Sequence, residues 1–139
     1  AIYAEICAHL FGFMRIEARK AVAAHFENYF AAPELHIYIP ALYHGDFGGS
    51  NILHDPARME ISGIIDFGFA GLGDPAFDLA SVSTYGAAFF ARICRHYPAD
   101  ESMLARARFY RGTFALQEAL HGFKNHDQEA LESGLESYI

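Results

Sequence analysis

The sequence has little of several features that mark other classes of protein. Its only two cysteines, Cys7 and Cys94, lie far apart and form no Cys-x-x-Cys pair. This spacing predicts neither a disulfide framework nor a zinc site, and a reducing cytosol is the expected compartment. No apolar run comes near the roughly 18 residues of a membrane-spanning helix. Glu5 and His9 interrupt the first apolar stretch, so no signal peptide is expected.

Positive charge is also scarce. Lysine and arginine together number 10 against 17 acidic residues, which gives a formal net charge of −7. Nucleic-acid binding needs clustered Lys and Arg against phosphates, so this balance argues against nucleic acid as the main partner. It is compatible with cationic ligands or a bound metal. The 139 residues are 53% hydrophobic, which is typical of a globular chain with its own core.

The hydrophobic pattern predicts a mostly helical chain with one small β-hairpin. Apolar residues recur at helical spacing over 2–10 and over 22–30, and Pro33 ends the second helix. Turn residues at 54–58 separate two apolar runs, which predicts a hairpin with strands 51–54 and 59–66. Antiparallel pairing would bring Asn51 and Asp66 close together.

The C-terminal half is expected to be helical again. Asp74 as a cap and Pro75 in the first turn begin a helix, and Gly86 divides that stretch in two. Pro98 ends the second piece. A long helix is expected from Asp100 or Ser102 to about Leu120, and a last helix follows Asn125 or Asp127. Five arginines in this half are interpreted as surface residues: Arg92, Arg95, Arg106, Arg108 and Arg111.

Two short sequence motifs contain the candidate catalytic and metal-binding residues. Residues 44–51 read His-Gly-Asp-Phe-Gly-Gly-Ser-Asn, and residues 66–68 read Asp-Phe-Gly. The first string has the His-x-Asp-x4-Asn spacing of a kinase catalytic loop, and the second is the motif that follows it in kinases. Phosphoryl transfer requires a group that faces the substrate hydroxyl and oxygen ligands that hold Mg²⁺ against the phosphates. Asp46 suits the first role, and Asn51 with Asp66 suits the second.

At these residues the sequence resembles the aminoglycoside phosphotransferase family, whose fold is similar to that of protein kinases. The matching strings are 44–46 (His-Gly-Asp), Asn51, 65–67 (Ile-Asp-Phe), 73–75 (Gly-Asp-Pro) and Asp78. The resemblance implies that Asp46 is the catalytic base and that Asn51 and Asp66 bind Mg²⁺. It implies that Asp78 is a buried carboxylate that braces the catalytic loop, and that His44 holds the loop by hydrogen bonding.

The same resemblance implies which parts of such an enzyme this chain holds. The family's N-terminal lobe has a Gly-rich strand-turn-strand, a strand lysine paired with a helix glutamate, and a hinge for adenine, and none of these occurs here. The chain also begins without Met. We therefore expect residues 1–139 to be a single domain, the C-terminal catalytic lobe of a longer protein. Alone it would be nearly inactive, and its uncovered face would favour self-association.

The expected reaction is transfer of the γ-phosphate of ATP or GTP, with Mg²⁺, to a hydroxyl of a small molecule. Only residues 69–73 separate the Asp-Phe-Gly string from Asp74, which leaves no room for an activation loop or a peptide platform. Aminoglycosides head the acceptors by resemblance, and amino alcohols, sugars and other antibiotics remain open. On the last helix Glu129, Glu132 and Glu136 share one face, as a solvated surface or toward a cationic substrate.

Two other functions remain open at this point. The chain could be a non-catalytic nucleotide- or anion-binding module, similar to a pseudokinase. Mg²⁺-dependent nucleotide binding without a phosphorylated product would favour that function. It could also be a metal hydrolase that uses His44, Asp46 and Asp66, although these residues lack the spacing of His-rich metal sites.

Overall fold

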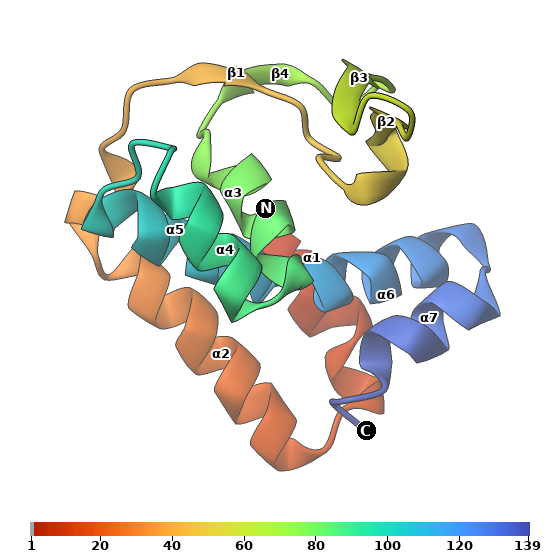
Figure 1. The fold of residues 1–139 in the computed structure, drawn as a ribbon. Coiled ribbons are helices and arrows are strands. Elements are labelled where there is room, and N and C mark those ends of the chain that lie inside the picture. Colours follow the sequence, from red (N-terminus) through yellow and green to blue (C-terminus); the bar gives the residue numbers. More distant parts are fainter. Residues whose placement is uncertain (1) are drawn as a thin grey trace. The chain divides into compact units, whose positions relative to one another are not determined.

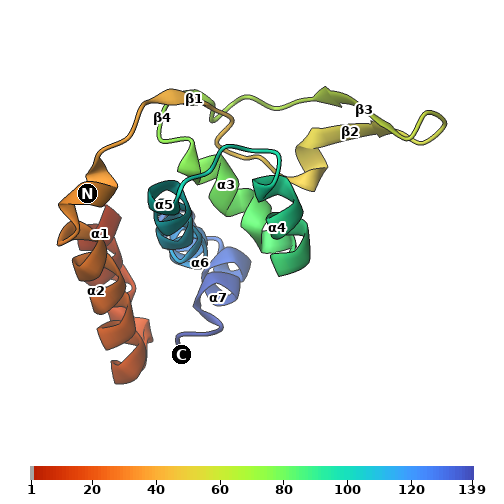
Figure 2. The same ribbon diagram turned by 60° about the vertical axis from the view of Figure 1, so that its left-hand side comes forward.

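The computed structural model describes residues 2–139, which divide into two compact units. The first unit contains residues 2–33 and 112–139, and the second contains residues 34–111. Figure 1 and Figure 2 show a mostly helical chain with two small antiparallel sheets, as the sequence predicts for the fold class. Among the described residues no helix has the length and apolar character needed to cross a membrane.

The first unit is built from helices alone. It contains α1 (Ile2–His9), α2 (Ile16–Phe30), α6 (Phe114–Asn125) and α7 (Gln128–Leu135), with a 3-10 turn at Phe11–Phe13. The predicted helix over 2–10 is confirmed as α1. The predicted helix over 22–30 is the C-terminal part of α2, which begins earlier, at Ile16. The largest fully buried side chains of the chain all lie in this unit: Phe26, Ile6, Leu10 and Leu116. A core of this kind stabilises the helices through burial of apolar area.

The surroundings of two side chains in this unit, Glu5 and Tyr138, shift their pKa values. Lys124 on α6 forms an ion pair with Glu5 on α1. The hydrogen bond and the positive charge of Lys124 lower the pKa of Glu5 below its usual value. Burial raises the pKa of Tyr138, whose backbone carbonyl accepts a hydrogen bond from Arg15 N at 3.0 Å. That bond ties the C-terminal end of the chain to the segment before α2.

The second unit contains both sheets and three helices. Its strands are β1 (Ala41–Tyr43), β2 (Ile52–Asp55), β3 (Glu60–Ile64) and β4 (Gly71–Gly73), and its helices are α3 (Ala76–Val82), α4 (Ala87–Cys94) and α5 (Glu101–Arg111). Short 3-10 turns lie at Pro33–His36, Gly49–Asn51 and Ser83–Tyr85, the first of them at the boundary of the two units. α3 packs against α5. Figure 2 shows the strands extending above α3 and α4.

The predicted hairpin is confirmed as β2 paired with β3. The register runs from Ile52 opposite Ile64 to Asp55 opposite Glu60, with an irregularity between Leu53 and His54. The second strand is shorter than predicted because the backbone of Asp66 turns to φ 60°, a left-handed conformation that ends an extended strand.

A second sheet, which the sequence analysis did not predict, pairs β1 with β4. Ala41 lies opposite Gly73, and Tyr43 lies opposite Gly71, in antiparallel register. The prediction of only one hairpin was therefore wrong. Each strand is three residues long, and β4 reads Gly-Leu-Gly, so neither strand shows an alternating pattern or a high β-propensity.

The prediction of one continuous helix from about residue 100 to Leu120 was also wrong, because the structure has two helices there. Its start is right, because Asp100 Oδ1 accepts a hydrogen bond from Met103 N at 2.7 Å at the beginning of α5. The helix ends at Arg111, however, and α6 begins at Phe114. Gly112 and Thr113 form the break, since glycine is a poor helix former. Thr113 stands at the position before α6, where its hydroxyl accepts a hydrogen bond from Gln117 Nε2 at 2.8 Å and caps no backbone amide. The predicted break at Gly86 and the last helix after Asp127 are confirmed.

Candidate functional site

The two sheets bring the two motif-bearing loops together. The first loop, residues 44–51, joins β1 to β2, and the second, residues 65–70, joins β3 to β4. Because β1 pairs with β4 and β2 pairs with β3, both ends of one loop lie beside both ends of the other. A hydrogen bond from Ile65 N to Asn51 O, at 3.0 Å, continues this pairing into the loops. The chain thereby places Asn51 next to the segment that carries Asp66.

His44 is buried, and its side chain holds the first loop by hydrogen bonding. Its Nδ1 accepts a hydrogen bond from Asp46 N at 3.3 Å, and its Nε2 lies 2.9 Å from the carbonyl oxygen of Ile65. An imidazole that accepts at Nδ1 and faces a carbonyl at Nε2 carries its proton on Nε2. Both ring nitrogens are therefore occupied, and the ring joins the first loop to the second. The Phe67 ring packs against it with centroids 4.6 Å apart.

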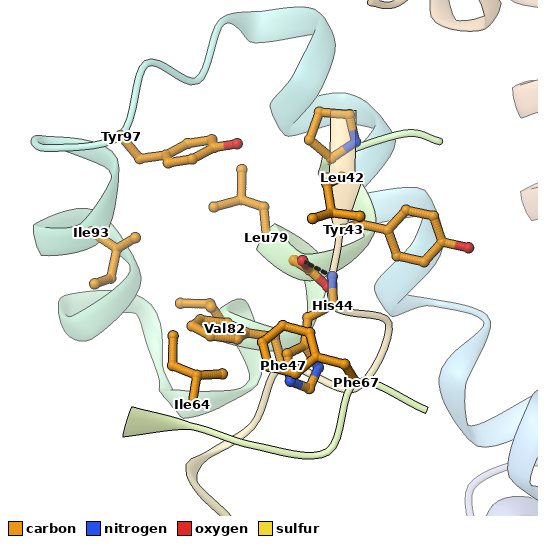
Figure 3. Close-up of a pocket in the computed structure, with 12 residues that line it drawn as sticks. Leu42, Tyr43, His44, Phe47, Ile64, Phe67, Leu79, Val82, Ile93 and Tyr97 are labelled. Atoms are coloured by element: carbon orange, nitrogen blue, oxygen red, sulfur yellow. Dashed lines mark hydrogen bonds between the residues drawn. The ribbon is translucent and has the colours of Figure 1, made fainter. Parts of the chain in front are cut away.

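Asp78, in the first turn of α3, holds the start of the same loop. Its two carboxylate oxygens accept hydrogen bonds from the backbone amides of His44 at 2.6 Å and Gly45 at 2.9 Å, and Figure 3 marks the contact to His44. Hydrogen bonds from amides to an ionised carboxylate are among the stronger ones in proteins. The half-buried carboxylate thus fixes two consecutive residues just before Asp46.

Asp46 and Asn51 form a pair across the loop. Asn51 is buried, and its Nδ2 donates to the carbonyl oxygen of Asp46 at 2.9 Å and to Asp46 Oδ2 at 3.0 Å. The amide nitrogen of Asn51 is committed to Asp46, which leaves Oδ1 as its oxygen for another ligand. The exposed Asp46 carboxylate has one oxygen oriented by Asn51, and its other oxygen is the one suited to accept a proton.

Asp66 is exposed and begins the Asp-Phe-Gly string in the left-handed region. Its Oδ1 lies 3.4 Å from Gly68 N, a long contact that leaves the carboxylate largely uncommitted. Aspartate tolerates positive φ better than most residues, and such conformations concentrate at functional sites. The turn at Asp66 redirects the chain from β3 toward β4.

The oxygen donors here suit a magnesium ion that is completed by phosphate and water. Residues 2–139 hold no group of three or more His, Cys, Asp or Glu side chains that could bind a metal on their own. Both ring nitrogens of His44 already have hydrogen-bond partners within the fold. Mg²⁺ usually takes only one or two protein carboxylates or amides, and Asn51 Oδ1 with the Asp66 carboxylate fits that number.

Gly45 is required by the backbone of the first loop. Its φ is +86°, and a Cβ at this position would lie 2.3 Å from the carbonyl oxygen of Phe69 in the second loop. We predict that Gly45→Ala lowers the free energy of unfolding by about 1–3 kcal/mol, since it adds both strain and a clash with backbone. The measurement is urea denaturation followed by circular dichroism. Gly12→Ala is the matched control, because a Cβ added at Gly12 would meet no other residue within 4 Å. An equal loss in both variants would contradict the prediction.

A buried ion pair, which the sequence analysis missed, lies at the start of α3. Arg106 Nε donates to Asp74 Oδ2 at 2.7 Å, and Tyr110 Oη donates to the same oxygen at 3.1 Å. Asp74 Oδ1 accepts from Ala76 N at 3.0 Å, so its carboxylate caps the first amide of α3, and the helix begins one residue later than predicted, after Pro75. The interpretation of Arg106 as a surface residue was wrong, because both side chains of the pair are 4% exposed. The two residues are 32 positions apart in the sequence, and the spacing of the arginines along α5 does not indicate which of them is buried.

The three glutamates of the last helix lie in the other compact unit. Glu129, Glu132 and Glu136 line a surface hollow of about 750 Å³ together with Ser133 and Ile139. Glu132 Oε1 accepts a hydrogen bond from Gln128 Nε2 at 2.7 Å. All three side chains are exposed, and they share one concave surface of negative charge.

Comparison with known proteins identifies related sequences. The pattern of the family described as "Phosphotransferase enzyme family" matches residues 13–123. Viomycin phosphotransferase from Streptomyces vinaceus is 39% identical over 102 residues, a match that covers 70% of this chain and 36% of that protein. The chain thus spans little more than a third of the length of this relative.

Solved structures share the fold at lower identity. The GDP complex of wild-type aminoglycoside 2'-phosphotransferase-IIIa matches with a TM-score of 0.88 and 23% identity, covering 97% of this chain and 47% of that chain. The gentamicin complex of APH(2'')-IIa matches with a TM-score of 0.75 and 21% identity, covering 97% of this chain and 48% of that chain. At these identities the likeness establishes the fold, and it extends over nearly all of this chain.

Proposed function

Because this chain belongs to the phosphotransferase enzyme family, we propose that it is the C-terminal lobe of a small-molecule O-phosphotransferase. The observation that carries the proposal is the arrangement of the first loop. An exposed Asp46 carboxylate is oriented by a buried Asn51, in a loop that Asp78 and His44 fix at its start. A preorganised carboxylate of this kind can act on a hydroxyl with little rearrangement.

Each residue of the site has a proposed role. Asp46 accepts the proton of the acceptor hydroxyl as the hydroxyl oxygen bonds to the γ-phosphorus of ATP or GTP. The bond from that phosphorus to the bridging oxygen breaks, and the nucleoside diphosphate leaves. Asn51 Nδ2 keeps the carboxylate in place. Asn51 Oδ1 and the Asp66 carboxylate would hold Mg²⁺, which neutralises charge on the phosphates when bound. His44 and Asp78 are positioning residues that hold the loop and touch neither substrate.

The phosphate donor in this proposal is ATP or GTP. Similar solved structures were determined as complexes with GDP or ADP. This chain contains no Gly-rich phosphate loop and no strand lysine paired with a helix glutamate. We therefore propose that a second lobe of a longer protein supplies most of the nucleotide contacts, and that residues 1–139 alone have little activity. Without that lobe, the exposed apolar side chains on the strands of the second unit would favour self-association.

The proposed acceptor is a small hydroxyl compound, and cationic antibiotics are the first to test. The relative at 39% identity is named for viomycin, and one similar structure was solved with kanamycin. The hollow lined by Glu129, Glu132 and Glu136 would complement a polycation, and its charge supports this acceptor class.

The test is an assay of nucleotide consumption by the full-length protein and by residues 1–139 alone. Viomycin, kanamycin, an amino alcohol and a sugar serve as acceptors with Mg·ATP and Mg·GTP. We expect acceptor-dependent turnover in the full-length protein and at least a thousandfold less in the short chain, since the phosphate contacts are missing. Nucleotide binding without a phosphorylated product from any acceptor would instead support a non-catalytic binding module.

A further inference from the structure

The second unit contains an apolar pocket, which is lined by residues of the first loop, the second loop and the helices α3 and α4. Its volume is about 370 Å³, within the range of small-molecule sites. Figure 3 shows Phe47 and Phe67 close together, Leu79 and Val82 of α3 near the middle of the view, and Ile93 of α4 on the left. The pocket therefore lies between the two motif-bearing loops and the helices α3 and α4.

The lining defines the chemistry of an occupant. Only two of the lining side chains, His44 and Asp78, carry a titratable group of the kind that is charged near neutral pH, and both already form hydrogen bonds within the fold. A ligand that carried a charge into this pocket would lose its hydration without gaining a partner. Four aromatic rings contribute to the wall, from Tyr43, Phe47, Phe67 and Tyr97. Such rings favour offset or edge contacts with a flat ring system.

The helix α4 supplies a wall that is poorly packed without an occupant. Its sequence is mainly apolar, yet none of its eight residues is buried. Ile93 lines the pocket and is half-buried. Several wall side chains of this open pocket are exposed, among them Leu42 and Phe67, and an apolar ligand would remove their apolar surface from water.

From these observations we propose that the pocket is a binding site for an uncharged, planar aromatic molecule. The site is separate from the Mg²⁺ ligands and from the proton-accepting carboxylate. It adjoins them through the chain, because Phe47 follows Asp46 and Phe67 follows Asp66. Binding there does not depend on the proposed phosphotransferase activity, so the two proposals fail or succeed separately.

Indole is the probe for this site. The chain contains no tryptophan, so indole fluorescence excited beyond the tyrosine absorption band reports only the probe. We expect saturable binding at one site with a dissociation constant of about 0.1–1 mM, which is ordinary for a ligand of this size. Linear, non-saturating uptake by the chain would overturn the proposal.

Two variants with the same substitution locate the binding. Ile93→Phe fills the pocket and should weaken indole binding at least tenfold, whereas Ile61→Phe, at a position 67% exposed on β3 outside the pocket, should leave it unchanged. Equal binding by both variants would overturn the proposal. If Ile93→Phe does not fold, nuclear Overhauser effects in the wild-type chain decide instead. Indole protons should show contacts to the methyl groups of Val82 and Ile93, and contacts to Ile61 alone would exclude the pocket.

Discussion

Asp46→Asn in the full-length protein should lower kcat by about 10²–10⁴-fold with little change in KM for the acceptor or in stability. The amide keeps the shape of the side chain and can still pair with Asn51 across the loop. It cannot accept a proton from the acceptor hydroxyl, however, so the loss appears in the chemical step. The measurement is steady-state kinetics with a saturating acceptor, combined with thermal unfolding of both proteins.

Asp55→Asn is the matched control for this prediction. Asp55 lies at the end of β2, and its Oδ1 accepts a hydrogen bond from Ala57 N at 2.9 Å in the turn of the hairpin. The same chemical change there should leave kcat within about twofold, because surface substitutions away from a site have small effects. Unchanged turnover in Asp46→Asn would remove Asp46 from the mechanism.

The largest effect on stability is expected from the ion pair at the start of α3. Arg106→Met should lower the free energy of unfolding by about 3–5 kcal/mol, because the Asp74 carboxylate stays buried without its counterion. The loss reaches the site through α3, since Asp74 caps the helix whose first turn carries Asp78. Urea denaturation of residues 1–139 measures the change directly.

Two further variants distinguish this explanation from a general effect of removing an arginine. Arg108→Met changes an exposed arginine on the same helix and should cost less than about 0.5 kcal/mol. The double variant Asp74→Asn with Arg106→Met should lose less than the sum of its two single variants, since neither then leaves a charge unpaired. Strictly additive losses of unfolding free energy would mean that the interaction between Asp74 and Arg106 contributes nothing to stability.

The fold was predictable wherever the sequence carried a long or repeated pattern. Helices α1 and α2 follow from apolar spacing, and the hairpin of β2 and β3 follows from two apolar runs around a turn. The order of the two motifs along the chain also pointed to one site, because antiparallel strands return Asp66 to the neighbourhood of Asn51. Local patterns therefore predicted which residues the loops would carry.

The features that the sequence did not predict depend on contacts between distant residues. The sheet of β1 and β4 is held by pairing between segments about 30 residues apart in the chain, and each strand is too short to show a pattern. The ion pair of Arg106 with Asp74 likewise forms only when α5 packs against α3. Gly112 was a signal for the end of α5 that the sequence analysis did not use, because glycine is a poor helix former.

The most direct test of the account is the mass of the acceptor after reaction. Full-length wild-type protein and its Asp46→Asn variant would each be incubated with Mg·ATP or Mg·GTP and viomycin or kanamycin, and the antibiotic analysed by mass spectrometry. We expect that the wild type adds one phosphoryl group to a hydroxyl of at least one acceptor and that the variant adds almost none. Equal phosphorylation by both proteins, or an unmodified acceptor alongside free phosphate, would contradict it.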